Sequence, residues 1–472
     1  MITIVNIVVY LSFIGMMGYY FITNLQWYSY RLERVVFHHT KIWWHFVYFL
    51  IPFVLYELTT ALSDGKYGFV IALLYLPLFV YWVKGLDKKL VFTGRVKRFF
   101  AALFFFAIFM AFSFHFYSIF IPIMLAYAAS LMIEKMLFEG FKRKAENKLE
   151  SMKEMIVIGV TASYGKTSIK NFIAHLLKRR YKVYATPRSV NTFGGVLKDI
   201  NEELPDDTEV YVVEMGARGE GDIAEIATFV NPHYAVVGKI GPAHIEYFRT
   251  LEKIRNTKME ILKSDRLKEA WVDQSARIKP TEDIHMFGQD VRDVKATLEG
   301  TSFTLDGVHY YASILGAFNA MNLAAAVKVA KALGLSDEEI EEGLLTLEPV
   351  PHRLQRIDAG GKVILDDSFN GNIDGMLASF DLAATYPGRK VIITPGLVEA
   401  DESLNIQVAK RANELFDLVI VTGDLNYAIF KEQIDPDKLR KLSSKEKMEE
   451  MLITETMAGD LILFANDAPS FI

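Results

Sequence analysis

The chain has 472 residues, a formal net charge of −5, 51% hydrophobic residues and no cysteine. At roughly 150 residues per domain it is long enough for about three domains, and its balance of charge gives no reason to expect nucleic acid as a partner. The lack of cysteine excludes disulfides, zinc–thiolate sites and cysteine nucleophiles.

The apolar residues are concentrated in the first third of the chain, which we interpret as a membrane region. A spanning helix needs about 20 mostly apolar residues. We expect five spans: Thr3 to Ile22, Trp43 to Leu62, Phe69 to Val83, and two within Phe99 to Ile133 that turn near His115. The alternative for the first span is a cleaved signal peptide. We reject the signal peptide because the apolar run of the first span is too long, no basic leader precedes it and further spans follow.

Basic residues near the span ends predict the orientation, because cytoplasmic loops carry an excess of Lys and Arg. They cluster after the first, third and fifth spans, whereas the other two turns carry almost none. The clusters are Arg31, Arg34 and Lys41; Lys84, Lys88, Lys89, Arg95, Lys97 and Arg98; and Lys135, Lys142, Arg143, Lys144 and Lys148. We therefore expect a multi-pass protein of the cytoplasmic (inner) membrane, embedded in the lipid bilayer, with the remaining residues in the cytoplasm.

Beyond residue 150, short apolar runs alternate with amphipathic stretches. Met155 to Val160, Glu209 to Gly216 and Tyr234 to Gly241 are typical of buried parallel strands, and Ser168 to Arg180 has the spacing of a helix. This alternation predicts an α/β fold with a parallel sheet covered on both faces. Ligands of such sheets bind beyond the carboxyl ends of the strands, so we expect a site there.

A second α/β region follows an Ala-rich helix expected from Asn322 to Leu335. The runs KVILDDS, VIITPG and LVIVTG are further short strands. We therefore expect three domains: a transmembrane helical domain with basic cytoplasmic loops at 1–150, a P-loop ATPase-like ATP-binding domain at 151–345, and a smaller Rossmann-like domain at 346–472.

The stretch TASYGKTS, Thr161 to Ser168, lies between the first strand and the first helix. In a phosphate-binding loop, backbone N–H groups and the following helix N-terminus hold the phosphates. Lys166 would reach the outer phosphates and the Thr167 hydroxyl would bind Mg²⁺. The usual longer pattern has a second glycine where Val160 stands. The predicted ATP-binding loop is Thr161, Ala162, Ser163, Tyr164, Gly165, Lys166, Thr167 and Ser168.

This loop resembles the compressed T-G-x-x-G-K-[ST] loop of the Mur ligase family, with Ala162 in place of glycine. Further blocks that resemble the family follow in order. They are EMGARGEGDI (Glu214 to Ile223), GPAHIEYF (Gly241 to Phe248), NTKMEIL, LGAFNAMNLAAA (Leu315 to Ala326), PVPHRLQ and LDDSFNGNIDGM (Leu365 to Met376). The last block is similar to that of the branch that adds D-alanyl-D-alanine. The resemblance covers residues 151 to 460.

The resemblance implies an ATP-dependent amide ligase of peptidoglycan precursor synthesis. It would join the amine of D-alanyl-D-alanine to the terminal carboxylate of a nucleotide-linked muramoyl tripeptide through an acyl phosphate. Cations are needed because a carboxylate must approach the γ-phosphate. Two alternatives stay open: another amide ligase on this fold, making poly-γ-glutamate or a wall-modifying amide, and a non-catalytic membrane ATP sensor. Membrane enzymes of cell-wall precursor synthesis are candidate partners.

The family's site residues carry over position by position. Thr167 and Glu214 would hold one Mg²⁺, His244 a second, and Lys258 would be carbamylated into an oxygen ligand. The implied catalytic residues are Lys166, Lys258, His244 and Arg353. Asn319, Asn322, Arg353 and Asp366 would approach ATP, and Asn191, Thr192, Asp367, Asn370 and Asn372 would contact the substrates.

From the sequence alone, structural roles without a ligand also stay open for the same side chains. Glu214 fits a helix cap or salt bridge, His244 a structural hydrogen bond, Lys258 an exposed surface position and Arg353 a hinge. Asn191 fits a polar loop without a ligand.

Several positions depart from the family pattern. Phe318 stands where the family has histidine, and we expect it to stack on adenine. Ile373 replaces a proline and Gly375 a serine, which bears on amine specificity. The family's soluble domain that grips UDP has no counterpart before Ile156; either the spans only dock the enzyme at the membrane, or the basic loop from Lys84 to Arg98 binds the diphosphate. We also expect the family's C-terminal helix to be missing after the strand at 461–464.

Overall fold

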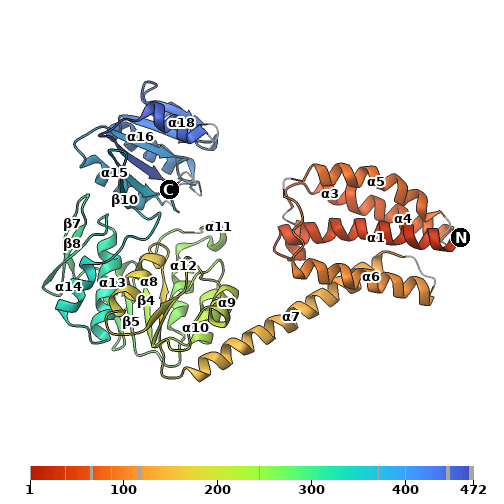
Figure 1. The fold of residues 1–472 in the computed structure, drawn as a ribbon, viewed down its shortest axis with the longest axis horizontal. Helices are drawn as coiled ribbons and strands as arrows, with labels where there is room; N and C mark the ends of the chain where they lie inside the picture. The colour runs from red at the N-terminus through yellow and green to blue at the C-terminus, as the bar shows by residue number, and fades with distance from the viewer. Residues whose placement is uncertain are drawn as a thin grey trace. The chain divides into compact units, whose positions relative to one another are not determined.

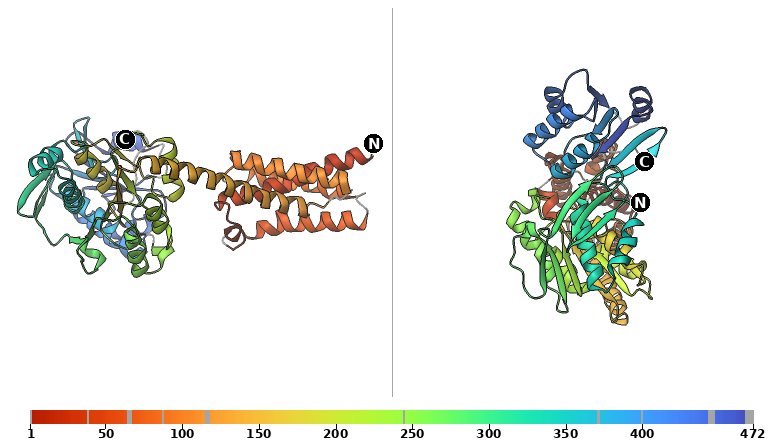
Figure 2. Two further views of the ribbon diagram at one scale, coloured as in Figure 1. Left: turned by 90° about the horizontal axis from the view of Figure 1, so that it is seen from below. Right: turned by 90° about the vertical axis from the view of Figure 1, so that its left-hand side faces the viewer.

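The structure, a computed structural model, describes residues 2–37, 39–63, 67–86, 88–114, 118–243, 245–369, 372–398, 400–442 and 447–466. The chain divides into two compact units, Met1–Arg143 and Lys144–Ile472. Figures 1 and 2 show the helical first unit and the mixed α/β second unit, and each is described by itself.

The first unit is helical throughout its described secondary structure. Its elements are α1 (Ile2–Trp27), α2 (Leu32–Phe37), α3 (Trp43–His45), the π-helical η1 (Phe46–Leu50), α4 (Ile51–Leu62), α5 (Gly68–Lys84), α6 (Gly94–Phe114) and α7 (Phe120–Ser151). Within the described part of the chain, four helical stretches are long and apolar enough to cross a membrane: Ile7–Trp27, Trp43–Leu62, Gly94–Ser113 and Phe120–Ser151. The fifth, α5, is a shorter apolar helix. The turn predicted near His115 lies outside the described residues.

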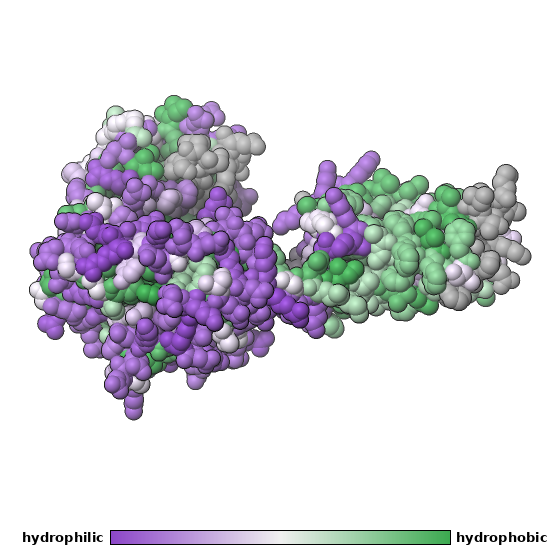
Figure 3. All heavy atoms as spheres, turned by 60° about the horizontal axis from the view of Figure 1, so that its bottom comes forward, coloured by the Kyte–Doolittle hydropathy of each residue, from purple (hydrophilic) through white to green (hydrophobic). Residues whose placement is uncertain are grey.

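Hydrophobic side chains cover the outside of these helices (Figure 3). Phe105 and Phe112 of α6 are each more than 60% exposed. A water-soluble domain rarely exposes contiguous apolar patches of this kind, so the surface fits a lipid environment. Helix α7, with 32 residues, is about 48 Å long, which exceeds the roughly 30 Å of a bilayer core. Its charged second half therefore continues the helix beyond the apolar half.

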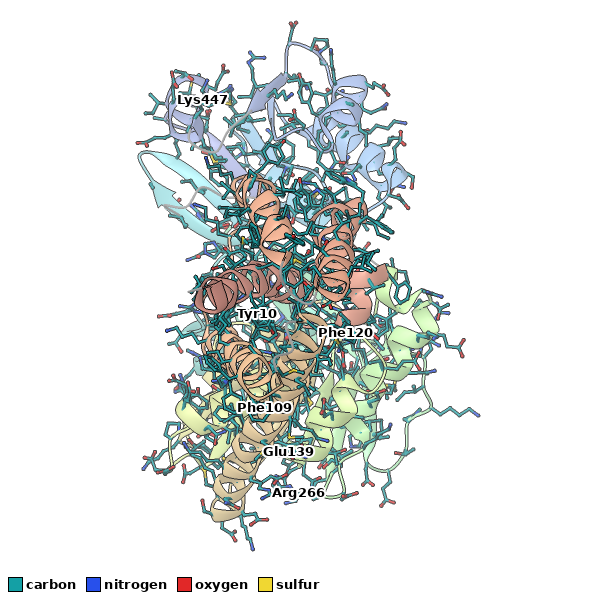
Figure 4. All side chains as sticks on the ribbon, turned by 90° about the vertical axis from the view of Figure 1, so that its right-hand side faces the viewer. Tyr10, Phe109, Phe120, Glu139, Arg266 and Lys447 are labelled. Carbon is teal, nitrogen blue, oxygen red and sulfur yellow. The ribbon has the colours of Figure 1, made fainter. Side chains whose placement is uncertain are left out.

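Aromatic rings fill the interior of the first unit. Phe13 of α1 stacks on Tyr56 of α4 at 4.4 Å between centroids and meets Tyr75 of α5 edge-on at 5.4 Å. The Tyr10 hydroxyl donates a hydrogen bond to the Ser118 carbonyl at 3.0 Å. Figure 4 labels Tyr10 on α1. These contacts fasten α1 to its neighbours, since aromatic pairs add to the stabilisation that burial alone provides.

The second unit contains a six-stranded parallel sheet in the order β2-β3-β1-β4-β5-β6. The strands are β1 (Ile156–Thr161), β2 (Val183–Ala185), β3 (Val210–Glu214), β4 (Tyr234–Val237), β5 (Glu269–Asp273) and β6 (Ile284–Phe287). Helices α8 (Lys166–Leu177) and α13 (Asn319–Ala332) cover one face, and α9 (Phe193–Glu202), α10 (Asp222–Val230) and α12 (Leu251–Met259) the other (Figure 1). The apolar runs of β1 and β3 are buried because both faces are covered. The predicted parallel sheet is confirmed.

An antiparallel meander follows that we did not predict. It comprises β7 (Val291–Ala296), β8 (Thr301–Leu305) and β9 (Val308–Ala312), and it packs on α13 and α14 (Asp337–Leu345). A two-residue Asp306-Gly307 turn joins β8 to β9, with both φ angles positive, at 51° and 82°. Asp-Gly between alternating runs is the strongest short-range signal of a hairpin, so the sequence did contain the information.

A second sheet, in the order β10-β11-β15-β12-β13-β14, is parallel except for β10. Its strands are β10 (Gln355–Ala359), β11 (Lys362–Asp367), β12 (Lys390–Thr394), β13 (Leu418–Thr422), β14 (Leu439–Leu442) and β15 (Leu461–Ala465). Its helices are α15 (Ile373–Ala384), α16 (Glu402–Leu415), α17 (Tyr427–Gln433) and α18 (Met448–Glu455). Strands were predicted in the runs KVILDDS, VIITPG and LVIVTG, and β11, β12 and β13 lie there, which confirms an α/β arrangement here. Shorter elements complete the unit: α11 (Ile245–Phe248), η2 (Glu260–Leu262) and η3 (Gln274–Ala276).

Candidate active site

The predicted phosphate loop connects β1 to α8 through a glycine in the left-handed region. Gly165 has φ +83°, and a Cβ placed on it would lie 2.5 Å from Oδ1 of Asn322. The loop is anchored to the segment after β4, because the Ser163 amide donates to the Lys239 carbonyl at 2.9 Å and the Ser163 hydroxyl to the Gly241 carbonyl at 3.0 Å. The loop conformation therefore depends on glycine at 165 and on the neighbouring strand.

Ala162, which replaces the family's glycine, is fully buried. Its methyl group faces Gly238, where an added Cβ would come within 3.0 Å of the Ala162 Cβ. A glycine on β4's C-terminal side thus leaves room for the extra methyl in the loop. This explains how the loop accommodates alanine at this position.

Substituting Gly165 by alanine is expected to weaken nucleotide binding at least about tenfold, because alanine in this conformation costs roughly 1–2 kcal/mol and its methyl would also displace Asn322. Gly307→Ala is the matched control, since Gly307 has φ +82° and open space within 4 Å of the position that its new methyl would take. Titration of a fluorescent ATP analogue measures both variants. Equal affinities for the two variants would contradict the role assigned to the loop.

Lys166 begins α8 and its ammonium turns back over the loop. Its Nζ donates to the carbonyls of Ala162 at 2.9 Å and Ser163 at 3.3 Å. Burial lowers the pKa of Lys166; the carboxylate of Glu214 opposes this shift and the guanidinium of Arg353 adds to it. Two backbone carbonyls of the loop therefore hold the Lys166 side chain in place, in buried surroundings that strengthen electrostatic interactions.

Glu214, at the carboxyl end of β3, is the centre of the cluster. It is only 1% exposed, and its carboxylate accepts hydrogen bonds from the Thr167 hydroxyl at 3.0 Å and the Asn191 amide at 2.9 Å. The Lys170 ammonium lies 3.4 Å from Oε2. A buried carboxylate requires such partners. Asn191, predicted to contact substrate, thus contacts Glu214.

Lys170 is the residue that the sequence analysis missed. It is 1% exposed, and Nζ donates to the carbonyls of Thr186 and Arg188, at 2.6 Å each, besides its ion pair with Glu214. The signal was available, because Lys170 follows Lys166 by four residues and Thr167 by three, which puts all three on one side of a helix. Lys170 therefore links β3 to the segment that precedes Asn191.

Lys258 in α12 is buried, with 4% of its surface exposed. Burial lowers its pKa to about 7, and the positive charge of Lys166 adds to that shift, while Asp222 and Glu260 oppose it. Near neutral pH much of this amine is therefore uncharged. The alternative of an exposed surface position for Lys258 is excluded, because the last turn of α12 is packed into the unit.

The structure describes both predicted ligands of the first Mg²⁺ ion but not His244, the predicted ligand of the second. The Thr167 hydroxyl and the Glu214 carboxylate lie together, and hard oxygen ligands of this kind suit Mg²⁺. His244 lies outside the described residues. Within the ranges that the structure describes, no group of three or more His, Asp or Glu side chains is arranged to hold a metal ion.

Asn319 and Asn322, which are predicted to approach ATP, lie in the first turns of α13. The Asn319 amide donates to the Leu315 carbonyl at 2.7 Å, and the Asn322 amide donates to Oδ1 of Asn319 at 2.8 Å. Asn322 touches the loop at Gly165, whereas Asn319 fixes the start of its own helix. Phe318, just before the helix, is 37% exposed, so its ring is open to solvent.

Arg353 enters the site from the segment before β10. Its guanidinium lies 4.7 Å from the centre of the Phe369 ring. Burial lowers the pKa of Arg353, and the negative charges of Glu214 and Asp367 oppose that shift. The guanidinium therefore interacts electrostatically with the carboxylate at the end of β3. A planar guanidinium suits phosphate oxygens.

The two aspartates at the end of β11 differ in their surroundings. Asp366 is fully buried, and its oxygens accept hydrogen bonds from Nδ1 of His352 at 2.7 Å and the Ser368 hydroxyl at 2.6 Å. Burial raises the pKa of Asp367 to about 7, although Arg353 opposes the shift. Asp367 is therefore a carboxyl group that changes charge near neutral pH.

Predicted substrate residues also cap helices. The Asn372 side chain accepts from the Gly375 amide at 3.0 Å and begins α15, and the Thr192 side chain accepts from the Gly195 amide at 3.3 Å and begins α9. Both are favoured N-cap residues. Asn370 lies outside the described residues. An ion pair of 2.7 Å between Lys239 and Asp374 joins the segment after β4 to the first turn of α15.

The site has the features of a nucleotide-binding α/β protein of the P-loop type. A loop joins a buried strand to a helix, a lysine lies over the loop, and a threonine contacts a carboxylate at the end of the neighbouring strand in the sheet. Comparison with known proteins narrows this class. Residues 160–330 match the family model described as the Mur ligase middle domain. The resemblance to the Mur ligase family inferred from the motifs is confirmed.

Relatives with a named activity are among the matches. The UDP-N-acetylmuramoyl-tripeptide–D-alanyl-D-alanine ligase of Synechocystis sp. is 32% identical over 253 residues, which is 52% of this chain and 55% of that protein. The enzyme of the same name from Bacillus subtilis is 28% identical over 332 residues, 65% of this chain and 72% of that protein. This chain thus spans little more than half the length of the Synechocystis relative.

Among solved structures, the MurF ligase of Thermotoga maritima in complex with ADP has a TM-score of 0.59 and 26% identity. The match covers 69% of this chain and 80% of that one. The second unit therefore has the fold of a Mur ligase.

Proposed function

We propose that the chain is a membrane-anchored ATP-dependent carbon–nitrogen ligase that adds D-alanyl-D-alanine to UDP-N-acetylmuramoyl-tripeptide. The observation that carries the proposal is the cluster at the edge of the central sheet, where Lys166 lies over the loop and the Thr167 hydroxyl lies 3.0 Å from Glu214. The named activity of the Synechocystis and Bacillus subtilis relatives supports the choice of substrates.

The chemistry runs in two transfers. A carboxylate oxygen of the tripeptide attacks the γ-phosphorus of ATP, the bond to the β-phosphate oxygen breaks, and ADP leaves. The neutral amine of D-alanyl-D-alanine then attacks the acyl carbon, and the bond from that carbon to the phosphate oxygen breaks. The amide forms as the nitrogen loses one proton, which leaves with the phosphate as hydrogen phosphate. Both transfers bring negative groups together, so fixed cations stabilise the transition states. Lys166 and Arg353 supply those cations from the middle and C-terminal regions.

Thr167 and Glu214 would hold Mg²⁺, since their oxygens are adjacent and of the type that this ion prefers. The ion would supply charge neutralisation at the phosphate oxygens. Lys170 and Asn191 orient Glu214 from its other sides. We propose His244 as a further metal ligand, on the strength of the family resemblance.

Lys258 is proposed to carry a carbamate, which would replace its positive charge by an oxygen ligand. Carbamylation requires a neutral amine, and a pKa of about 7 provides it. With ¹³C-bicarbonate, we expect a carbamate signal in the ¹³C NMR spectrum that grows as the pH rises from 6 to 8, because the neutral fraction increases through the pKa. Lys258→Arg should remove this signal, and Lys253→Arg, at an exposed lysine of the same helix, should leave it. A signal that Lys258→Arg leaves intact would contradict the assignment.

For the organisation of the chain, we propose an ATP-binding domain at 151–345 and a C-terminal domain at 346–472 that closes over ATP. We further propose that residues 1–150 cross the cytoplasmic membrane five times, with α5 as the short third span. Asn319, Asn322 and Asp366 are proposed on the nucleotide side, and Asn191, Thr192, Asp367, Asn370 and Asn372 on the substrate side.

The test is phosphate release by the full chain in nanodiscs, with ATP, Mg²⁺, UDP-N-acetylmuramoyl-tripeptide and D-alanyl-D-alanine. We expect release that depends on both substrates, and a product that is heavier by one dipeptide less one water in mass spectrometry. Turnover with glutamate in place of the dipeptide would favour the poly-γ-glutamate alternative. Binding of ATP with no turnover for any amine would favour the sensor.

A further inference from the structure

An apolar groove lies on the surface of the first unit between α1, α5 and α6. It has a volume of about 600 Å³ and is lined by Leu11, Ser12, Gly15, Met16, Tyr19, Phe79, Phe92, Lys97, Phe100 and Phe104. Eight of these ten residues are apolar or aromatic, and one is charged. A groove of this composition accepts a hydrocarbon chain.

The groove has one cationic end. Helices α1 and α6 run antiparallel, because Gly15 faces Phe104 and Gly18 faces Phe99. Lys97, near the start of α6, therefore lies beside the C-terminal end of α1, after which the first basic residues follow. The ring of Phe104 lies farther from that end, in the apolar part of the groove. From Lys97 to Phe104 the groove extends about 10 Å along α6.

Among the three basic side chains in the first turns of α6, Lys97 is the one whose charged group has no partner among the described residues. Arg98 donates to Glu134 at 3.1 Å, and the guanidinium of Arg95 lies 3.7 Å from the centre of the Tyr30 ring. The Lys97 ammonium has no hydrogen bond or ion pair among the described residues, although the side chain lines the groove. It is therefore the cation that is available to a ligand in the groove.

The walls of the groove are held in place by polar contacts. The Gln26 side chain accepts from the Val91 amide and donates to its carbonyl, at 2.9 Å each, and the Trp27 ring donates to the Lys88 carbonyl at 3.2 Å. These bonds fix the segment that carries Phe92 against the end of α1. Gly15 adds space because it has no side chain.

We propose that this groove binds a lipid phosphate, with the long apolar chain of the lipid between α1 and α6 and its phosphate on Lys97. The charge on Lys97 complements a phosphate, and a lysine at the membrane surface attracts anionic head groups. The aromatic lining buries the first part of the chain, which gives the site its affinity for a lipid over a free anion. The site belongs to the first unit and does not depend on the ligase reaction.

The test uses the full chain in detergent, with hexadecyl phosphate as the probe and native mass spectrometry as the readout. Hexadecanol, which has the apolar chain without the phosphate, and inorganic phosphate, which lacks the chain, are the comparison ligands. We expect hexadecyl phosphate to bind at least tenfold more tightly than either. Lys97→Gln should weaken binding about tenfold, because hydrogen bonds to charged groups contribute most, and Ser12→Trp should weaken it similarly by filling the groove.

Two matched variants control for general effects. Lys135→Gln removes an exposed charge from α7, and Val8→Trp adds a large side chain on the exposed side of α1 outside the groove. Both should bind within twofold of the unchanged protein, and gel filtration should show all four variants folded. Equal binding of hexadecanol, or equal loss in Lys97→Gln and Lys135→Gln, would overturn the proposal. Recovery of the chain among soluble proteins would instead overturn the membrane assignment.

Discussion

Replacing Lys166 by methionine is expected to lower kcat for phosphate release at least about a thousandfold, since removing one preorganised donor at a developing charge costs 10²–10³ in rate and here a full charge is lost too. Methionine keeps most of the apolar stem, so packing of the first turn of α8 changes little. The ammonium now lies over the carbonyls of Ala162 and Ser163, where the phosphates of ATP are proposed to sit.

Lys178→Met is the control for that variant. Lys178 directly follows the same helix and is exposed, and its ammonium has no ion pair among the described residues. It should keep kcat within twofold. Measuring the affinity for ATP separately shows whether Lys166 acts in binding or in the transfer. If Lys166→Met retained more than a tenth of the activity, the loop would not be the phosphate site.

The strand–loop–helix unit was predictable because its signals are local. A buried apolar run ends at the loop, a glycine stands where φ is positive, and a helix begins at the next residue. Glu214 was placed at a strand end by the same reasoning. Helical spacing places Lys170 on the same side of α8 as Lys166 and Thr167. It does not show that Lys170 and Asn191 contact Glu214, because they reach it only where β1 lies beside β3 in the sheet.

Other features depend on contacts that the sequence does not show. Thr192 and Asn372 are predicted substrate residues, and the structure adds a second role, because both begin helices as N-caps, a role that their residue types alone favour. The room for Ala162 depends on Gly238, which is 76 residues away in the chain. Such pairs are fixed by tertiary packing and have no local pattern.

Replacing Lys170 by methionine is expected to destabilise the second unit strongly. The variant leaves Glu214 buried without its cation and removes the donor from the carbonyls of Thr186 and Arg188. Breaking a buried ion pair by removing one partner costs about 3–5 kcal/mol, which for a unit of this size corresponds to a fall in melting temperature on the order of 10 °C. Thermal unfolding of the full chain, followed by limited proteolysis of the second unit, measures it.

The control is Lys198→Met, which removes an exposed i,i+4 ion pair with Glu202 and should cost less than about 1 kcal/mol. A second variant separates charge from packing: adding Glu214→Gln to Lys170→Met should restore part of the lost stability, because a neutral amide no longer requires a cation. The double variant should stay inactive, since the proposed Mg²⁺ ligand is gone. If Lys170→Met were as stable as Lys198→Met, Lys170 would not hold Glu214 in place. The hydrogen bonds from Thr167 and Asn191 would then be enough to position the carboxylate.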